Sequence, residues 1–144
     1  MMQISALQDG LAQKSARLER CVQRAREEYA SATHFLTDFT RQDAAILNIQ
    51  RACELAIDMG NMVISFEGWG LPASARDVFA TLRQRAIIEP DMAQSLERMV
   101  GFRNIAVHEY QALDISIVAS VIEREIDCLL QFAGQLLGYY LKRT

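Results

Sequence analysis

Residues 46–63 read ILNIQRACELAIDMGNMV, and the spacing of their apolar side chains indicates the fold class. These side chains recur at alternating steps of three and four, which is the period of an amphipathic helix. The stripe consists of Ile46, Ile49, Cys53, Ala56, Gly60 and Val63. A strand would alternate at every second residue, and no segment of the chain does so convincingly. We therefore expect a long helix here.

The flanking residues predict where this helix begins and ends. Thr40 is a suitable N-cap, and Asp43 three positions later gives a pattern close to a capping box. Downstream, Gly68, Gly70 and Pro72 lie within five residues, a composition that no helix can continue through. The second helix is therefore expected between these two signals.

Helical patterns also occupy the rest of the chain. A stripe of apolar residues predicts a first long helix over residues 4–36. Ser74 is expected to cap a short third helix, Pro90 suits the first turn of a fourth, and Asp114 suits the N-cap of the last. The stripe of the last helix includes Ile115, Val118, Ile122, Ile126, Leu129, Phe132 and Leu136. We expect one all-α domain over residues 1–144, an antiparallel helical bundle of two long helices, two shorter helices and a long C-terminal helix.

Composition limits the function classes. With 144 residues, 51% hydrophobic and 23% charged, the chain resembles an ordinary globular protein. No run approaches the ~18 apolar residues of a membrane span, and residues 1–5 do not begin a secretion signal, so we expect a cytoplasmic protein without a membrane partner. The net charge of −3 argues against coating nucleic acid by bulk electrostatics.

The basic residues are nearly all arginine. Of the 15, only Lys14 and Lys142 are lysines. Arginine contacts phosphate through two parallel hydrogen bonds, so a local phosphate pocket is compatible with an acidic chain. Genome composition is an equally good explanation of the arginine excess.

Cysteine and histidine are too few for a metal or disulfide framework. The spacings of Cys21, Cys53 and Cys128 fit neither a disulfide framework nor a metal site. All three lie in periodic apolar stretches, so we interpret them as buried thiols in a reducing compartment. His34 and His108 are the only histidines, and we interpret His34 as a surface or interface residue. We therefore expect no metal site and no cofactor.

Residues 101–110, GFRNIAVHEY, gather polar side chains after an apolar helix face. Asn104 and His108 are four apart and share a face of a helix. Arg103 and Tyr110 are seven apart and nearly aligned if the helix extends that far, and the arginine stem can curl toward the imidazole. The four side chains could converge on one anion-sized pocket. Alternatively, this is only a helix C-terminus with a capping histidine and arginine.

The pattern Arg103-x4-His108-x-Tyr110 resembles the signature of the HEPN superfamily, and residues 101–110 resemble the HepT family of ribonuclease toxins. Leu71-Pro72 and Val78-Phe79-x-x-Leu82 resemble the middle segment of that family. The resemblance implies a helical bundle, a homodimer with facing motifs and metal-independent RNA cleavage. It also implies a nucleotidyltransferase antitoxin, MntA-like, that adenylylates Tyr110.

These residue types fit that chemistry. RNA carries its own nucleophile, the 2′-OH, so cleavage to a 2′,3′-cyclic phosphate needs a base, an acid and a cation beside the phosphate. His108 can transfer protons near neutral pH, and Arg103 can bind two phosphate oxygens. Asn104 could orient His108 or donate to phosphate. Tyr110 could contact RNA phosphate and accept adenylyl groups, although it could also merely pack the helix end.

Two other classes of function remain open at this point. The chain could be a noncatalytic helical partner of a nucleotidyltransferase, binding nucleotide or only docking it. It could also be a four-helix interaction module without any nucleic-acid role. An RNA cleavage assay separates the first from a ribonuclease, and a His108 substitution that changes stability alone would indicate the second.

Overall fold

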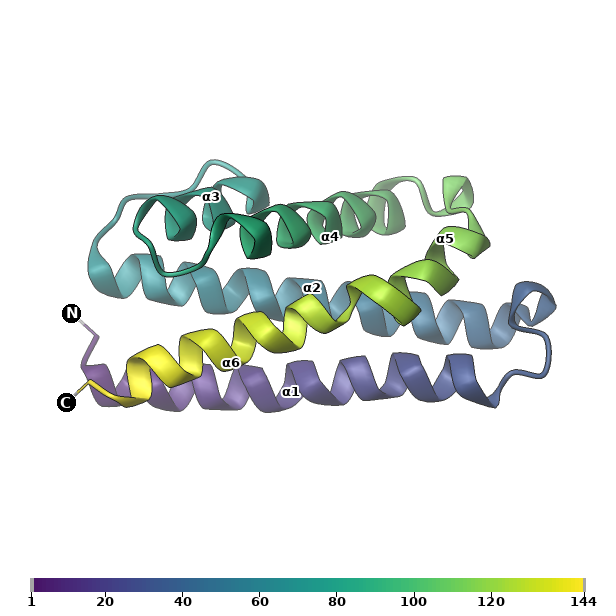
Figure 1. Ribbon diagram of the computed structural model, residues 1–144, viewed down its shortest axis with the longest axis horizontal. Helices are drawn as coiled ribbons and strands as arrows, with labels where there is room; N and C mark the ends of the chain where they lie inside the picture. The colour runs from purple at the N-terminus through teal and green to yellow at the C-terminus, as the bar shows by residue number, and fades with distance from the viewer. Residues whose placement is uncertain (1, 144) are drawn as a thin grey trace.

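The computed structural model describes residues 2–143, and all regular structure in that range is helical. Figure 1 shows the long helices running alternately in opposite directions, with both termini at the same end. The helices are α1 (Ile4–Ser31), α2 (Phe39–Glu67), α3 (Ala75–Gln84), α4 (Pro90–His108), α5 (Ile115–Ser120) and α6 (Asp127–Leu141). Short 3-10 turns at Phe35–Thr37 and Tyr110–Ala112 and a π-turn at Val121–Glu125 lie between them. The predicted all-α antiparallel bundle is confirmed.

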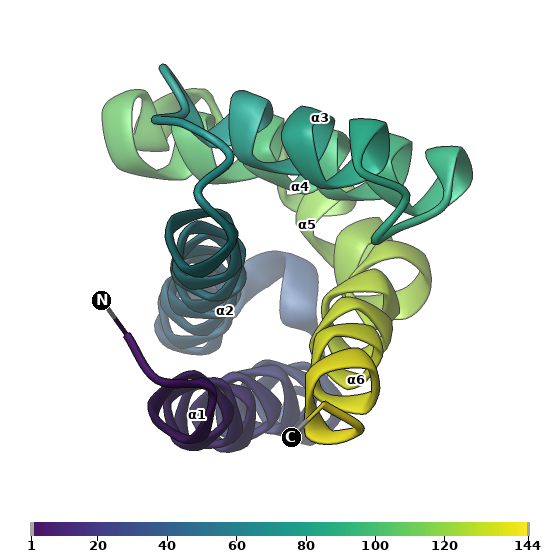
Figure 2. The same ribbon diagram turned by 90° about the vertical axis from the view of Figure 1, so that its left-hand side faces the viewer.

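Packing places α2 at the centre of the arrangement. It contacts α1 along its length and also packs against α3, α4 and α6. Viewed end-on, α1, α2 and α6 lie around a common core that the α3–α4 pair covers from above (Figure 2). A helix that is apolar on several faces needs neighbours on each of them, and the buried residues of α2 fit this requirement.

Three predicted helix starts are confirmed. The Ser74 hydroxyl accepts a hydrogen bond from the Asp77 backbone N–H at 3.2 Å. Pro90 occupies the first turn of α4, and the Asp114 carboxylate accepts from the Ser116 backbone N–H at 2.9 Å. The break after α2 is also confirmed, since Gly68 ends that helix with φ +71°, a left-handed conformation that favours glycine.

The predicted junction between the first two helices is wrong in two respects. α1 ends at Ser31 rather than near Leu36, and Asp38 caps α2 in place of Thr40 by accepting from the Arg41 backbone N–H at 3.1 Å. The physical reason is Phe35, which is buried and whose carbonyl accepts a hydrogen bond from the Gln42 side chain at 2.8 Å. This turn fixes the chain direction, so α2 begins one residue before Thr40.

The last helical stretch follows the predicted stripe with one irregularity. Val118, Ile122 and Ile126 are buried as expected, and each follows the one before it by four residues. In a regular α-helix, two such steps are longer than two turns of 3.6 residues, so the three side chains would drift around the helix. The π-turn at Val121–Glu125 takes up the difference, because it adds one residue to the turn. The stripe therefore stays on the core from α5 into α6.

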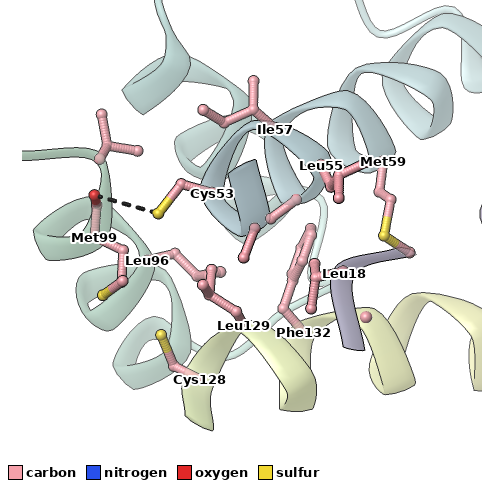
Figure 3. Close-up of a cluster of buried hydrophobic side chains, with 14 of the residues drawn as sticks. Leu18, Cys53, Leu55, Ile57, Met59, Leu96, Met99, Cys128, Leu129 and Phe132 are labelled. Atoms are coloured by element: carbon pink, nitrogen blue, oxygen red, sulfur yellow. Dashed lines mark hydrogen bonds between the residues drawn. The ribbon is translucent and has the colours of Figure 1, made fainter. Parts of the chain in front are cut away.

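Figure 3 shows part of the core that joins α2, α4 and α6. The Cys53 thiol of α2 donates to the Met99 carbonyl of α4 at 3.7 Å, and Cys128 of α6 lies nearby. Burial raises the pKa of Cys53, and raises that of Cys128 to about 12, so both are inert packing residues. Cys21 is only half-buried, so the prediction of burial holds fully for two of the three cysteines. Within residues 2–143, no helix is long and apolar enough to cross a bilayer.

Candidate functional site

The last two turns of α4 carry Arg103, Asn104 and His108, and Arg103 contacts the middle of α2. The contact between Cys53 and the Met99 carbonyl marks the register of the two antiparallel helices one turn earlier. Arg103 follows Met99 by four residues and so lies on the same face of α4. Its side chain therefore reaches α2.

Arg103 is partly buried and paired with a carboxylate of α2. Its Nη1 lies 3.2 Å from Oε1 of Glu54, and 18% of the arginine side chain is exposed. The Nε of Arg103 is buried without an acceptor among the described residues. A buried donor without a partner is uncommon in folded proteins, and protein atoms cover this one. The contact that the structure gives this guanidinium is with Glu54, and the approach of the arginine stem to His108 stays a prediction.

Asn104 and His108 share one face of α4, as their spacing predicts. The helix is continuous to His108, which is its last residue and is exposed. Asn104 is half-buried, and within residues 2–143 neither side chain makes a hydrogen bond to another residue. No hydrogen bond between the Asn104 and His108 side chains is therefore present in the described range, and the suggested orientation of His108 by Asn104 stays a prediction.

Tyr110 lies beyond the helix, contrary to the alignment expected with Arg103. α4 stops at His108, and Glu109 leaves the helical conformation with φ −141° and ψ 48°, so Tyr110 enters a 3-10 turn. The Tyr110 hydroxyl donates a hydrogen bond to Oδ1 of Asp43 on α2. Burial, then the hydrogen bond and charge of Asp43, raise the pKa of Tyr110 to about 12. The phenol is therefore held neutral while 43% of the residue stays exposed.

Two carboxylates of α2 thus contact the motif, and the sequence interpretation assigned neither to it. Asp43 was expected to complete a capping box, but its partner in the structure is Tyr110. Glu54 was not singled out. Their spacing is the feature of the sequence that could have indicated this. Eleven residues make three helical turns plus a rotation of about 20°, which puts Asp43 and Glu54 on one face of α2.

A separate apolar groove of about 420 Å³ lies on another face of α4, against the α5 region. Its lining includes Phe102, Ile105 and Ile117 but none of Arg103, Asn104, His108 or Tyr110. Ile105 and Ile117 are 39% and 55% exposed. This groove is therefore not the anion pocket that the sequence suggested. No cluster of three or more potential metal ligands occurs in the described range 2–143.

Comparison with known proteins connects this geometry to a family. The family described as Ribonuclease HepT-like matches residues 16–136. An mRNA nuclease HepT of Shewanella oneidensis is 40% identical over 126 residues, which are 88% of this chain and 95% of that protein.

Solved structures agree with the sequence match. A structure described as the tri-AMPylated Shewanella oneidensis HEPN toxin in complex with MNT antitoxin superposes with a TM-score of 0.86 at 38% identity, covering 90% of this chain and 98% of that chain. The Bacillus subtilis protein YutE, described as a cytosolic protein of unknown function, superposes with a TM-score of 0.71 at 16% identity, covering 96% of this chain and 90% of that chain. At that identity the second comparison supports the fold alone.

Proposed function

This chain belongs to the Ribonuclease HepT-like family, and we propose that it is a cytoplasmic ribonuclease toxin of a toxin–antitoxin pair that cleaves mRNA. The observation that carries the proposal is the placement of Arg103 and His108 on the last turns of α4. One is a partly buried cation paired with Glu54 of α2, and the other is an exposed imidazole. The relative that is 40% identical is an mRNA nuclease.

The proposed reaction uses the RNA 2′-OH as nucleophile and needs no metal ion. His108 transfers a proton at the 2′-oxygen or at the leaving 5′-oxygen, since an imidazole serves either role near neutral pH. Arg103 binds the crowded phosphoryl oxygens through the exposed part of its guanidinium, which Glu54 holds in place from α2. Asn104 supports this site as a donor to phosphate. The product carries a 2′,3′-cyclic phosphate.

A homodimer would supply the second proton-transfer group that one chain lacks. An isologous interface repeats the same patch on both copies, so it can place two His108 side chains in one cleft. The apolar groove beside α4, with Ile105 and Ile117 exposed on its rim, supports an interface close to the motif. Small-angle scattering should show a dimer, and a monomer at working concentration would contradict this part of the proposal.

The proposed control is adenylylation of Tyr110 by a nucleotidyltransferase antitoxin. The similar Shewanella toxin is AMPylated and bound to an MNT antitoxin. Tyr110 is exposed enough to be reached, and it follows His108 by two residues. An added AMP would bring a negative phosphodiester and a bulky nucleoside to the site, which would repel and block RNA.

An RNA cleavage assay with the purified chain tests the activity. Cleavage of an mRNA should persist in excess EDTA, and the 5′ fragments should end in a 2′,3′-cyclic phosphate. Loss of cleavage on chelation, restored by Mg²⁺, would refute the metal-independent mechanism. A chain that takes up AMP from the antitoxin but cuts no RNA would instead be a noncatalytic partner of the nucleotidyltransferase.

A further inference from the structure

The hydrogen bond between Tyr110 and Asp43 joins the proposed acceptor to a carboxylate on a different helix. We propose that Asp43 is the general base for adenylyl transfer to Tyr110, accepting the phenolic proton as the oxygen attacks the nucleotide. This inference rests on the proposed function, because it assumes that Tyr110 is the acceptor. It assigns a catalytic group to the toxin itself rather than to the antitoxin.

Asp43 is available as a base because no cation neutralises it. Within residues 2–143 it forms no ion pair, and the nearby Arg41 is committed to Glu28 at 2.9 Å and to Asp38 at 3.7 Å. Glu54, on the same face of α2, differs because Arg103 lies 3.2 Å from it. One carboxylate therefore pairs with the motif cation, and the other, without a cation partner in the described part of the chain, accepts the hydrogen bond of the motif phenol.

A tyrosine hydrogen-bonded to a carboxylate is not by that contact alone identified as the acceptor of the adenylyl group. Tyr29 donates to Glu123 at 2.7 Å, and the fully buried Tyr140 donates to Glu67 at 3.2 Å. Tyr110 differs in its position, since it is 43% exposed and lies at the end of α4 beside His108. These other pairs provide internal controls for the proposal.

The environment of Tyr110 also requires assistance with its proton. Its pKa of about 12 leaves roughly one phenolate in 10⁵ molecules at pH 7. Attack by a preformed phenolate would therefore be rare. A carboxylate already hydrogen-bonded to the hydroxyl can take the proton while the new bond forms, which avoids the free phenolate.

The step is a displacement at the α-phosphorus of ATP, which the antitoxin supplies. A bond forms between Tyr110 Oη and that phosphorus, and the bond from the phosphorus to the bridging oxygen of the β-phosphate breaks. Pyrophosphate leaves with the electron pair of that bond. The phenolic proton moves to Oδ1 of Asp43.

Asp43→Asn separates proton transfer from positioning. The asparagine oxygen can still accept the tyrosine hydrogen bond, but the amide cannot take up the proton. With the cognate nucleotidyltransferase, ATP and Mg²⁺, we expect kcat for labelling of Tyr110 to fall about 10²–10⁴-fold. The KM for the toxin should stay within about threefold, because docking is not altered. Asp43→Ala should lose the same activity and regain part of it in added formate or acetate.

Glu123→Gln is the matched control, because it alters a tyrosine–carboxylate pair away from the motif. It should leave Tyr110 labelling within about twofold of wild type. Labelling of Asp43→Asn at the wild-type rate, or a defect confined to KM, would overturn the assignment of Asp43 as base. Peptide mass spectrometry tests Tyr110 as the acceptor separately from Asp43 as the base. AMP on a residue other than Tyr110 in the wild-type chain would refute the acceptor, and with it the role of Asp43.

Discussion

Replacement of His108 by alanine should separate catalysis from stability. The imidazole is exposed, ends α4 and makes no side-chain hydrogen bond within residues 2–143. Its removal takes away at most an interaction with the helix C-terminus, of the kind that stabilises by about 0.3–1 kcal/mol. The proposed acid–base role predicts a loss of about 10²–10⁴ in cleavage rate, equivalent to about 3–5 kcal/mol of activation free energy.

The two magnitudes are far enough apart to distinguish the roles. A domain of ordinary stability, about 5–15 kcal/mol, stays almost wholly folded after losing ~1 kcal/mol, so unfolding cannot account for a hundredfold loss of rate. The assay compares initial cleavage rates of one RNA with thermal melts followed by circular dichroism. For a chain of this size, ~1 kcal/mol corresponds to a fall in Tm of about 2–4 °C.

His34→Ala is the matched control, because His34 is also exposed and lies between α1 and the following 3-10 turn. Its cleavage rate should stay within about twofold of wild type. Wild-type cleavage by His108→Ala would refute the site assignment. A large fall in Tm that accompanies the loss of rate would show that His108 acts as a structural cap.

Further predictions concern packing and titration. Gly60→Ala should destabilise by up to about 2 kcal/mol in denaturant titrations, because its methyl group would meet Val78 and this overpacking exceeds the gain in helix propensity. Gly134→Ala, whose methyl group meets nothing within 4 Å, should stabilise by about 1 kcal/mol. In ultraviolet difference titrations against Tyr110→Phe, Tyr110 should ionise near pH 12, and Asp43→Asn should lower this pKa only in part, because burial, the larger cause of the shift, remains. Because the folded pKa is the raised one, the stability that this phenol contributes is complete below about pH 10 and is lost as pH rises to 12.

The sequence by itself determined the helical class and much of each helix. The helix starts at Ser74, Pro90 and Asp114 were predictable because each depends on backbone groups within about four residues. The apolar stripe of the last helix was predictable for a related reason, since helical periodicity places those side chains on one face whatever they pack against. The motif residues were found through resemblance, and their roles stay predictions.

The tertiary structure decided the features that depend on contacts between distant segments. Asp38 and Thr40 are both competent caps locally, and burial of Phe35 selects Asp38. The end of α4 is another such feature, since the helical spacing alone would allow it to run on through Tyr110.

The partners of the motif also required the tertiary structure. Glu54 and Asp43 lie 49 and 67 residues from Arg103 and Tyr110 in the chain. Their spacing on α2 shows that they share a face, but only the antiparallel register of α2 against α4 brings that face to the motif. That register comes from the packing of the whole core, because no local interaction along either helix specifies which turn of one lies against which turn of the other.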